Sequence, residues 1–290
     1  MSQSPFFHYN CSFDAIDTMH RFAVESLESD PLYLTNFLGA KISTKFLPKI
    51  LDGKAGEVES IPIPANWHAD IAEWAFALRA VDLAEKKFCV LELGCGWACW
   101  LVNTGVAARS KGLEVTLIGI EGDEGHVDFA KEALTSNNFD KDDFSIIHGI
   151  AGHSSGKALF PVTNSGIDWG SEPILYATEI EIETSQREKT HHILNSYTMS
   201  DLSSNNQIDL LHIDIQGGET AFVKESIDEI EELVQRMLIG THSRIIEGEI
   251  MTFLFDRGWT LEMERPAIFG LVNGLPQIKV DGVQGWVSPK

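Results

Sequence analysis

The sequence predicts an α/β protein with a doubly wound parallel sheet, and three stretches carry this prediction. Residues 90–98, Val-Leu-Glu-Leu-Gly-Cys-Gly-Trp-Ala, join a short apolar run to a glycine turn and a helical segment. Residues 115–121 form a second apolar run, which ends on Glu121. Residues 208–219 form a third, which ends in two consecutive glycines and a glutamate. Short apolar runs that lead into glycine turns and helices are typical of strands in a parallel sheet.

Composition bounds the size of the fold and the classes of partner. The chain has 290 residues, of which 43% are hydrophobic, and a formal net charge of −21. This length suits one large domain, or one domain with a cap. An acidic surface repels phosphate backbones and anionic lipids, so we expect no nucleic-acid and no membrane partner. A homo-oligomer is compatible with the sequence, which leaves the oligomeric state open.

The cellular compartment is predicted from the start of the chain and from the cysteines. The first twenty residues contain no Lys or Arg, and no apolar run approaches the length of a membrane span. The cysteines have no zinc-site spacing, so we expect free, buried thiols in a reducing cytoplasm. They are Cys11, Cys89, Cys95 and Cys99.

Residues 1–85 are expected to form an N-terminal helical cap and the helix that leads into the sheet. Residues 13–27 and 32–51 have amphipathic helical patterns. From Asn66, the predicted N-cap, a further helical stripe leads into the first strand. His68 lies in the first turn of this helix, and for it we favour a surface or capping role over a functional one.

The first two strands place a carboxylate beside the glycine turn. In a right-handed βαβ unit their carboxyl ends lie side by side, so Glu121 is expected next to Gly94 and Gly96. A carboxylate there can accept two hydrogen bonds from a ribose diol, a role that we favour over that of a solvated strand-end charge. A third strand over 144–149 leads to Ile150, a candidate for the face of an adenine ring. An ordinary buried position is an equal alternative for Ile150.

The acidic residue that precedes the glycine turn helps to distinguish a nicotinamide-binding site from a site for another nucleoside cofactor. A nicotinamide fingerprint needs a third glycine, but position 99 is Cys99, and it needs an acid about 20 residues on, a spacing that Glu121 exceeds. The chain instead has Glu92 before its first glycine and Ala98 after its second, and this pattern resembles motif I of the class I S-adenosylmethionine-dependent methyltransferases. A sulfonium and an amino group favour a nearby carboxylate, whereas a pyrophosphate does not.

Residues 152–200 interrupt the alternation of strands and helices and are expected to be an insertion that covers the active site. The alternating residues 178–183 predict an exposed edge strand with Ile180 and Ile182 facing inward. At the far end of the chain, residues 259–262 and 284–287 are expected to be two closing strands of an antiparallel edge.

Two titratable residues are expected to meet at the switch point of the sheet. Asp214 ends the strand beside the first strand, and His242 follows the next strand. We expect His242 to act as a general base that Asp214 orients, with a structural Asp–His pair as the alternative. A divalent metal held by Asp214 and His242, with Glu219 as candidate third ligand, is a second mechanism that we do not favour.

A family resemblance rests on several of these motifs taken in order. They are Glu92-Leu93-Gly94-x-Gly96, Ile120-Glu121, His148-Gly149-Ile150-Ala151-Gly152, 210–219 and Ile239-Gly240-Thr241-His242. The series resembles the FkbM family of S-adenosylmethionine-dependent methyltransferases over about residues 88–262. His212 and Gly218 replace the family's usual lysine and alanine, and the glycine motif departs from its common form.

The resemblance implies a seven-stranded Rossmann-like methyltransferase sheet and an S-adenosylmethionine-binding domain over 86–290. We therefore expect methyl transfer from S-adenosylmethionine to a hydroxyl of a small, uncharged or cationic molecule, of sugar or secondary-metabolite type. One alternative is a nicotinamide-dependent oxidoreductase on the same kind of fold. Another is a nucleoside-binding module that has lost its chemistry.

Overall fold

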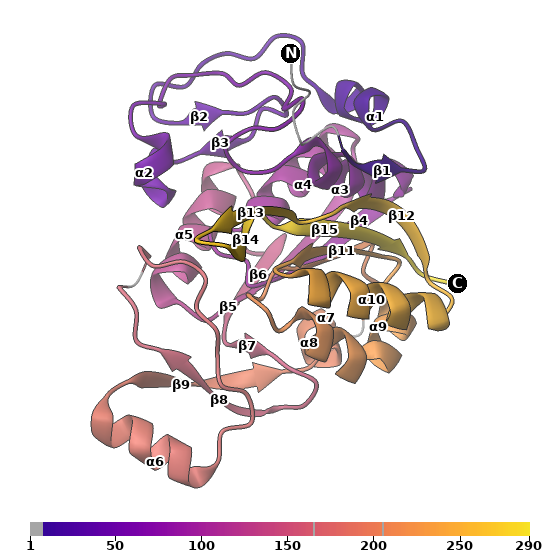
Figure 1. The fold of residues 1–290 in the computed structure, drawn as a ribbon. Coiled ribbons are helices and arrows are strands. Elements are labelled where there is room, and N and C mark those ends of the chain that lie inside the picture. The colour runs from indigo at the N-terminus through magenta and orange to yellow at the C-terminus, as the bar shows by residue number, and fades with distance from the viewer. Residues whose placement is uncertain (1–7, 165, 205) are drawn as a thin grey trace.

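The centre of the molecule is an eight-stranded sheet (Figure 1). The computed structural model describes residues 8–164, 166–204 and 206–290. The strands of this sheet are β1 (Asn10–Cys11), β4 (Lys87–Leu93), β5 (Glu114–Glu121), β6 (Phe144–His148), β10 (Leu210–Ile213), β11 (Arg236–Thr241), β12 (Thr260–Arg265) and β15 (Gly282–Val287). Their spatial order is β1-β12-β15-β11-β10-β4-β5-β6.

The sheet has the predicted doubly wound parallel core. Strands β6, β5, β4, β10 and β11 pair in parallel, and β15, β12 and β1 form an antiparallel edge. The chain adds strands on one side of β4 and then on the other, so the switch point lies between β4 and β10. The predicted closing strands are present as β12 and β15. The predicted count of seven is one too low, because the two-residue β1 pairs with β12.

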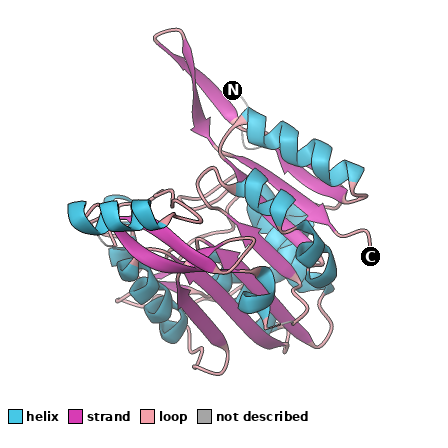
Figure 2. Ribbon diagram, turned by 90° about the horizontal axis from the view of Figure 1, so that it is seen from below, coloured by secondary structure: helices cyan, strands magenta, loops and turns pink. Residues whose placement is uncertain are grey.

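Helices cover both faces of the sheet (Figure 2). On one face lie α3 (Ile71–Leu83), α4 (Cys99–Ser110) and α5 (Glu124–Ser136). On the other lie α7 (Met199–Ser203), α8 (Glu219–Glu225), α9 (Ile227–Leu233) and α10 (Arg244–Asp256). Val90 packs into the first of the two resulting cores and Leu91 into the second, which explains why β4 is apolar from Phe88 to Leu91.

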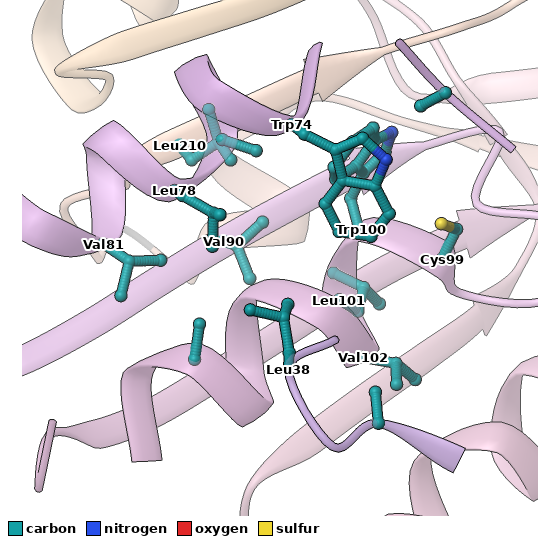
Figure 3. Packing of buried hydrophobic residues seen from close by; sticks show 14 of the residues in the cluster. Leu38, Trp74, Leu78, Val81, Val90, Cys99, Trp100, Leu101, Val102 and Leu210 are labelled. Carbon is teal, nitrogen blue, oxygen red and sulfur yellow. The ribbon is translucent and has the colours of Figure 1, made fainter. Parts of the chain in front are cut away.

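Tryptophans and aliphatic side chains fill the first core (Figure 3). Trp74 of α3 and Trp100 of α4 meet edge to face, with ring centroids 5.0 Å apart, above Val90 and Leu210 of the sheet. Such aromatic pairs add about 0.5–1.5 kcal/mol to the free energy of burial. This packing fixes the start of α4, which borders the glycine turn.

The helix before the first strand begins later than predicted. Its N-cap is Asp70, whose carboxylate accepts hydrogen bonds from the backbone of Ala72 and Glu73, and Glu73 completes a capping box. Asn66, the predicted cap, instead accepts from the backbone of His68 and Ala69 in the preceding turn. His68 is therefore held in a turn outside the helix.

The N-terminal cap is only partly helical. It contains α1 (Ala15–Phe22), β2 (Leu34–Thr35), β3 (Lys41–Ile42), the 3₁₀ helix η2 (Thr44–Phe46) and α2 (Pro48–Leu51). The helix predicted over 32–51 is wrong, because Asn36 binds the backbone N–H groups of Leu38 and Ala40 and closes a turn. Gly39 completes this turn at a φ of +85°, a value that L side chains rarely adopt.

The insertion forms a small three-stranded sheet with one helix, at one end of the molecule (Figure 1). Its elements are β7 (Ile150–Ala151), β8 (Gly156–Pro161), α6 (Glu179–Glu188) and β9 (His191–Tyr197). The edge strand predicted over 178–183 is wrong. Thr178 and Glu181 form a capping box that starts α6, and Ile180 is 76% exposed rather than inward.

A hairpin of β13 (Ile268–Val272) and β14 (Leu275–Val280) separates the two closing strands. It projects from the body of the molecule (Figure 2) and had no counterpart in the sequence prediction. No helix among the described residues is both long and apolar enough to cross a bilayer.

Candidate active site

A cavity of about 590 Å³ opens at the carboxyl ends of β4, β5 and β10. Its volume lies in the usual range for small-molecule sites. It is lined by every residue that the sequence predicted for the cofactor, Glu92, Gly94, Gly96, Glu121 and Ile150, and by Asp214. His242 is not part of this lining. The pocket thus occupies the switch-point crevice that the strand order creates.

Glu121 is held rigidly at the end of β5. One carboxylate oxygen accepts a hydrogen bond of 2.9 Å from the Gly96 backbone N–H, and the other accepts one of 2.8 Å from Asp123. The residue is 8% exposed, and it borders the pocket. The carboxylate is therefore fixed beside the glycine turn, as predicted. Its contact with a ribose remains a prediction.

The two glycines of the turn are required for different reasons. A Cβ on Gly94 would lie 2.4 Å from the Asp214 carbonyl oxygen, so this glycine lets the ends of β4 and β10 approach each other. A Cβ on Gly96 would lie 2.7 Å from the ring of Trp169, which comes from the insertion. That ring also stacks on His126 at 3.9 Å. Both glycines line the pocket, and the indole of Trp169 covers Gly96.

Glu92 is engaged with the protein as well as with the pocket. Its carboxylate accepts backbone hydrogen bonds from Trp100 and Leu101, at 3.3 and 3.1 Å, in the first turn of α4. Ala98, the N-cap, offers no side-chain cap, so Glu92 supplies it from the neighbouring strand. Burial raises the pKa of Glu92 to about 8, although these backbone bonds act to lower it.

The insertion side of the pocket has an apolar part. Ile150 is 8% exposed and packs with Ala158 and Phe160. Ile150 and Phe160 both line the cavity, together with Tyr176. The arrangement suits a flat ring, which is the use that the sequence predicted for Ile150. No observation tests this use.

Asp214 and His242 meet as predicted, and Glu219 joins them. His242 Nε2 lies 3.2 Å from Asp214 Oδ1, and its Nδ1 lies 3.0 Å from Glu219 Oε1. Glu219 is fully buried at the start of α8, where its carboxylate accepts backbone hydrogen bonds from Ile215 and Gly217. His242 thus lies between two carboxylates.

The surroundings of His242 argue against its predicted role as general base, and that role stays an untested prediction. Burial acts to lower the pKa of His242, but the close carboxylates of Asp214 and Glu219 outweigh it and raise the pKa to about 10. An imidazolium at neutral pH has no lone pair to accept a proton. For Asp214, burial opposes ionisation, but His242 and Gln216 bring the pKa below its usual value. Asp214 is the member that borders the pocket.

The same three side chains are a candidate metal site, because one ligand atom from each lies within 4.8 Å of the others. Their contacts fit a proton better than a metal ion. The two ring nitrogens of His242 face different carboxylates, whereas a single ion binds one nitrogen only. Both oxygens of Glu219 already accept backbone N–H groups.

The end of the pocket opposite the insertion contains two histidines that sequence reasoning left aside. His68 contacts Cys99 Sγ through Nε2, and its ring lies 5.4 Å from that of Trp100. His212 of β10 lies 5.8 Å from Trp100 on another side. His212 was visible in the sequence only as a departure from the family's lysine, and His68 only as a residue near the start of a helix.

A comparison with known sequences decides the family. A protein of Jannaschia sp. (strain CCS1) named "Putative methyltransferase" is 48% identical over 272 residues, which cover 93% of this chain and 98% of the relative. The chain belongs to the methyltransferases. No family model matches this methyltransferase, so the narrower resemblance to the FkbM family is not confirmed.

Solved structures similar to this methyltransferase share little sequence with it. One is a precorrin-6Y C5,15-methyltransferase from Geobacter metallireducens GS-15, with a TM-score of 0.44, 10% identity, and coverage of 77% of this chain and 90% of that one. Another is the human methyltransferase 10 domain containing protein, with a TM-score of 0.40, 12% identity, and coverage of 76% and 83%.

Proposed function

We propose that this methyltransferase uses S-adenosylmethionine and transfers its methyl group to a hydroxyl of a small, uncharged or cationic molecule. The observation that carries the proposal is the pocket at the switch point. A fixed carboxylate, Glu121, lies beside the glycine turn on one side of the pocket, and Asp214 lies on the other. A candidate nucleoside site and a titratable group in one crevice support this proposal.

The residues present fit S-adenosylmethionine. Glu121 would accept hydrogen bonds from the ribose hydroxyls, Ile150 would lie on the adenine, and Glu92, Gly94 and Gly96 would border the methionine part. The bound cofactor supplies a methyl group that its sulfonium has already activated. The protein then mainly has to hold the acceptor in line with that group.

Asp214 is the proposed proton acceptor for the hydroxyl. A hydroxyl that attacks carbon must lose its proton, and Asp214 is the member of the Asp214–His242–Glu219 group that lines the pocket. His242 is a positioning residue in this scheme, since it holds the Asp214 carboxylate at 3.2 Å. Gln216 holds the same carboxylate oxygen at 3.0 Å.

The two alternative functions, an oxidoreductase and a binding module without chemistry, differ from the proposed one in the ligand bound or the product formed. Membership of the methyltransferases favours the methyl donor over a nicotinamide cofactor. A module without chemistry would bind the cofactor but produce no methylated product. Assignment to the FkbM subgroup rests on the motifs of residues 88–262 and is part of the proposal.

Calorimetric titration with S-adenosylmethionine, its demethylated product and NAD tests the cofactor. We expect the first two to bind and NAD not to bind. Glu121→Gln should weaken binding by about 1–3 kcal/mol, because it removes hydrogen bonds to a charged group. Glu114→Gln, at the exposed start of the same strand, is the matched control. Unchanged affinity in Glu121→Gln would place the ribose elsewhere.

A further inference from the structure

One end of the pocket has a chemistry that the cofactor does not use. We call this the histidine end, and its members all line the cavity: His68, Trp97, Cys99, Trp100, His212 and Asp214. It lies on the β10 side of the glycine turn, whereas Glu121 and Ile150 lie on the β5 and β7 side. With the nucleoside on Glu121, as the proposed function has it, the histidine end is the part left for a second ligand.

His212 is a buried polar group of this end with one ring nitrogen that lacks a partner among the described residues. The residue is 5% exposed, and its Nδ1 has no hydrogen-bond partner among the described residues. The nearest carboxylate oxygen, Glu92 Oε1, lies 3.7 Å from that nitrogen, beyond hydrogen-bond distance. Buried polar groups are normally hydrogen-bonded, so an imidazole left without a partner in a pocket wall points to a ligand.

Burial favours the neutral form of both imidazoles of the histidine end. Burial lowers the pKa of His212 to about 4 and the pKa of His68 to about 3. A neutral imidazole offers one donor and one acceptor, which match a hydroxyl group. No Lys or Arg of the described residues lines the pocket, so the histidine end has no permanent cation that would pair with an anion.

Indole rings form the apolar part of the same end. Trp100 lies between the two histidines, 5.4 Å from His68 and 5.8 Å from His212, and Trp97 lies 5.8 Å from His68. Trp97 stacks on Phe46 and Trp100 packs against Trp74, so both indoles are fixed in place. Rigid indole faces suit flat or ring-shaped ligands.

We infer that the histidine end binds the methyl acceptor as an uncharged ring that bears a hydroxyl group, with His212 bonded to that hydroxyl and the indoles against the ring. The inference rests on the proposed function for the position of the cofactor. The proposed function allows an uncharged or a cationic methyl acceptor, and the inference restricts it to an uncharged one. Aromatic phenols and saturated sugar rings share this chemistry.

Binding of small probes, followed by NMR of the indole N–H groups, tests the inference without knowledge of the natural acceptor. The protein, saturated with demethylated cofactor product, is titrated with phenol and with methyl glucoside. We expect at least one of the two to bind saturably and to shift indole resonances, which also tells whether the ring is aromatic or saturated. Benzoate, which is charged, and anisole, which has no hydroxyl, should bind at least several-fold more weakly than phenol if phenol is the ligand.

Variants of His212 complete the test. His212→Phe keeps the ring shape and should weaken the bound probe about tenfold, the usual effect of one hydrogen bond. His212→Asn, a second variant in case the first fails to fold, should retain part of the affinity. His192→Phe, on β9 and outside the pocket lining, is the control. Equal affinity in wild type and His212→Phe, or no saturable probe in the wild type, would overturn the inference.

The outcomes separate this inference from the proposed function. Should the demethylated product not bind, the cofactor assignment fails, and the same titrations are run on the free protein. Should the product bind while neither probe does, the cofactor assignment stands and the histidine end is not the acceptor site.

Discussion

The carboxylates around this pocket differ in what already satisfies them. The carboxylates of Glu92, Glu121 and Glu219 all accept hydrogen bonds from backbone N–H groups. Glu121 nevertheless lines the pocket. Among the described residues, the side chains of His242 and Gln216 bind the Asp214 carboxylate, and the Asp214 side chain is 43% exposed. Asp214 is therefore the acid with the most freedom to exchange a partner for a substrate.

Replacement of Asp214 by asparagine tests its role as proton acceptor. The substitution keeps the shape but removes the basic oxygen, so we expect turnover to fall by about 10²–10⁴-fold. Cofactor affinity, measured by calorimetry, should stay nearly unchanged. Asp209→Asn, at the other end of the same strand, is the control. Full turnover in Asp214→Asn would remove it from the reaction.

The pH dependence of stability tests the charge on His242. A pKa raised from its usual value near 6.5 to about 10 adds stability that is fully present below about pH 6.5 and is lost as the pH rises through about 10. The groups that face His242 are Asp214, Glu219 and Asp281. We expect His242→Gln to destabilise the protein by roughly 1–3 kcal/mol at about pH 6, and by much less above about pH 10.

Urea unfolding of wild type and His242→Gln at both pH values measures this difference. His192→Gln, an exposed histidine, controls for general effects of the substitution. A free-energy difference that stays constant across the range would show that His242 is neutral in the folded protein.

Among the elements, the loop of 162–178 has the most direct bearing on ligand entry. Asp123, the N-cap of α5, holds it through Thr163 Oγ1 at 2.6 Å and the Gly166 N–H at 2.9 Å. From there the loop carries Trp169 over Gly96. A cofactor that lies against the glycine turn must displace this indole.

Trp169→Ala should therefore speed the association of the demethylated product by roughly twofold to tenfold, since less of the protein is in a blocked state. Stopped-flow measurement of association and dissociation rates gives the result. Ile167→Ala, an exposed residue of the same loop, is the control. Slower association or faster dissociation would show instead that Trp169 belongs to the bound cofactor's surroundings.

How far the sequence predicted each element depended on whether its signal was local. The segments that form β4, β5, β10 and β11 are hydrophobic, and this alone predicts that they are buried strands. The sequence therefore predicted the parallel core and the contact of Asp214 with His242. Helix α6 was misread because alternation was weighed above the Thr178–Glu181 capping box.

Other features have no local signal at all. The two residues of β1 are a strand only because β12 lies beside them. The charge of His242 depends on Glu219, which lies on another element. The protonation of His242 could therefore not be predicted from the spacing of residues along the sequence. The position of Trp169 over Gly96 likewise depends on how the loop crosses the pocket.

For the whole molecule, net charge is the property with the clearest consequence. At −21 the chain repels phosphate backbones, so we expect no binding of tRNA or duplex DNA even at low salt, where attraction would be strongest. Fluorescence anisotropy with labelled nucleic acid is the measurement. Micromolar affinity that weakens with added salt would show a basic patch and would redirect the search for the acceptor toward RNA or DNA.

The order of strands at the antiparallel edge also determines which part of the sheet can form first during translation. β1 leaves the ribosome before the other strands of the sheet, its partner β12 is made some 250 residues later, and β15, which joins β12 to β11, is made after β12. The nascent chain can build the parallel half of the sheet before β15 is made, whereas the antiparallel edge can close only once β15 is available. Loss of β15 would thus leave β12 and β1 without a place in the sheet.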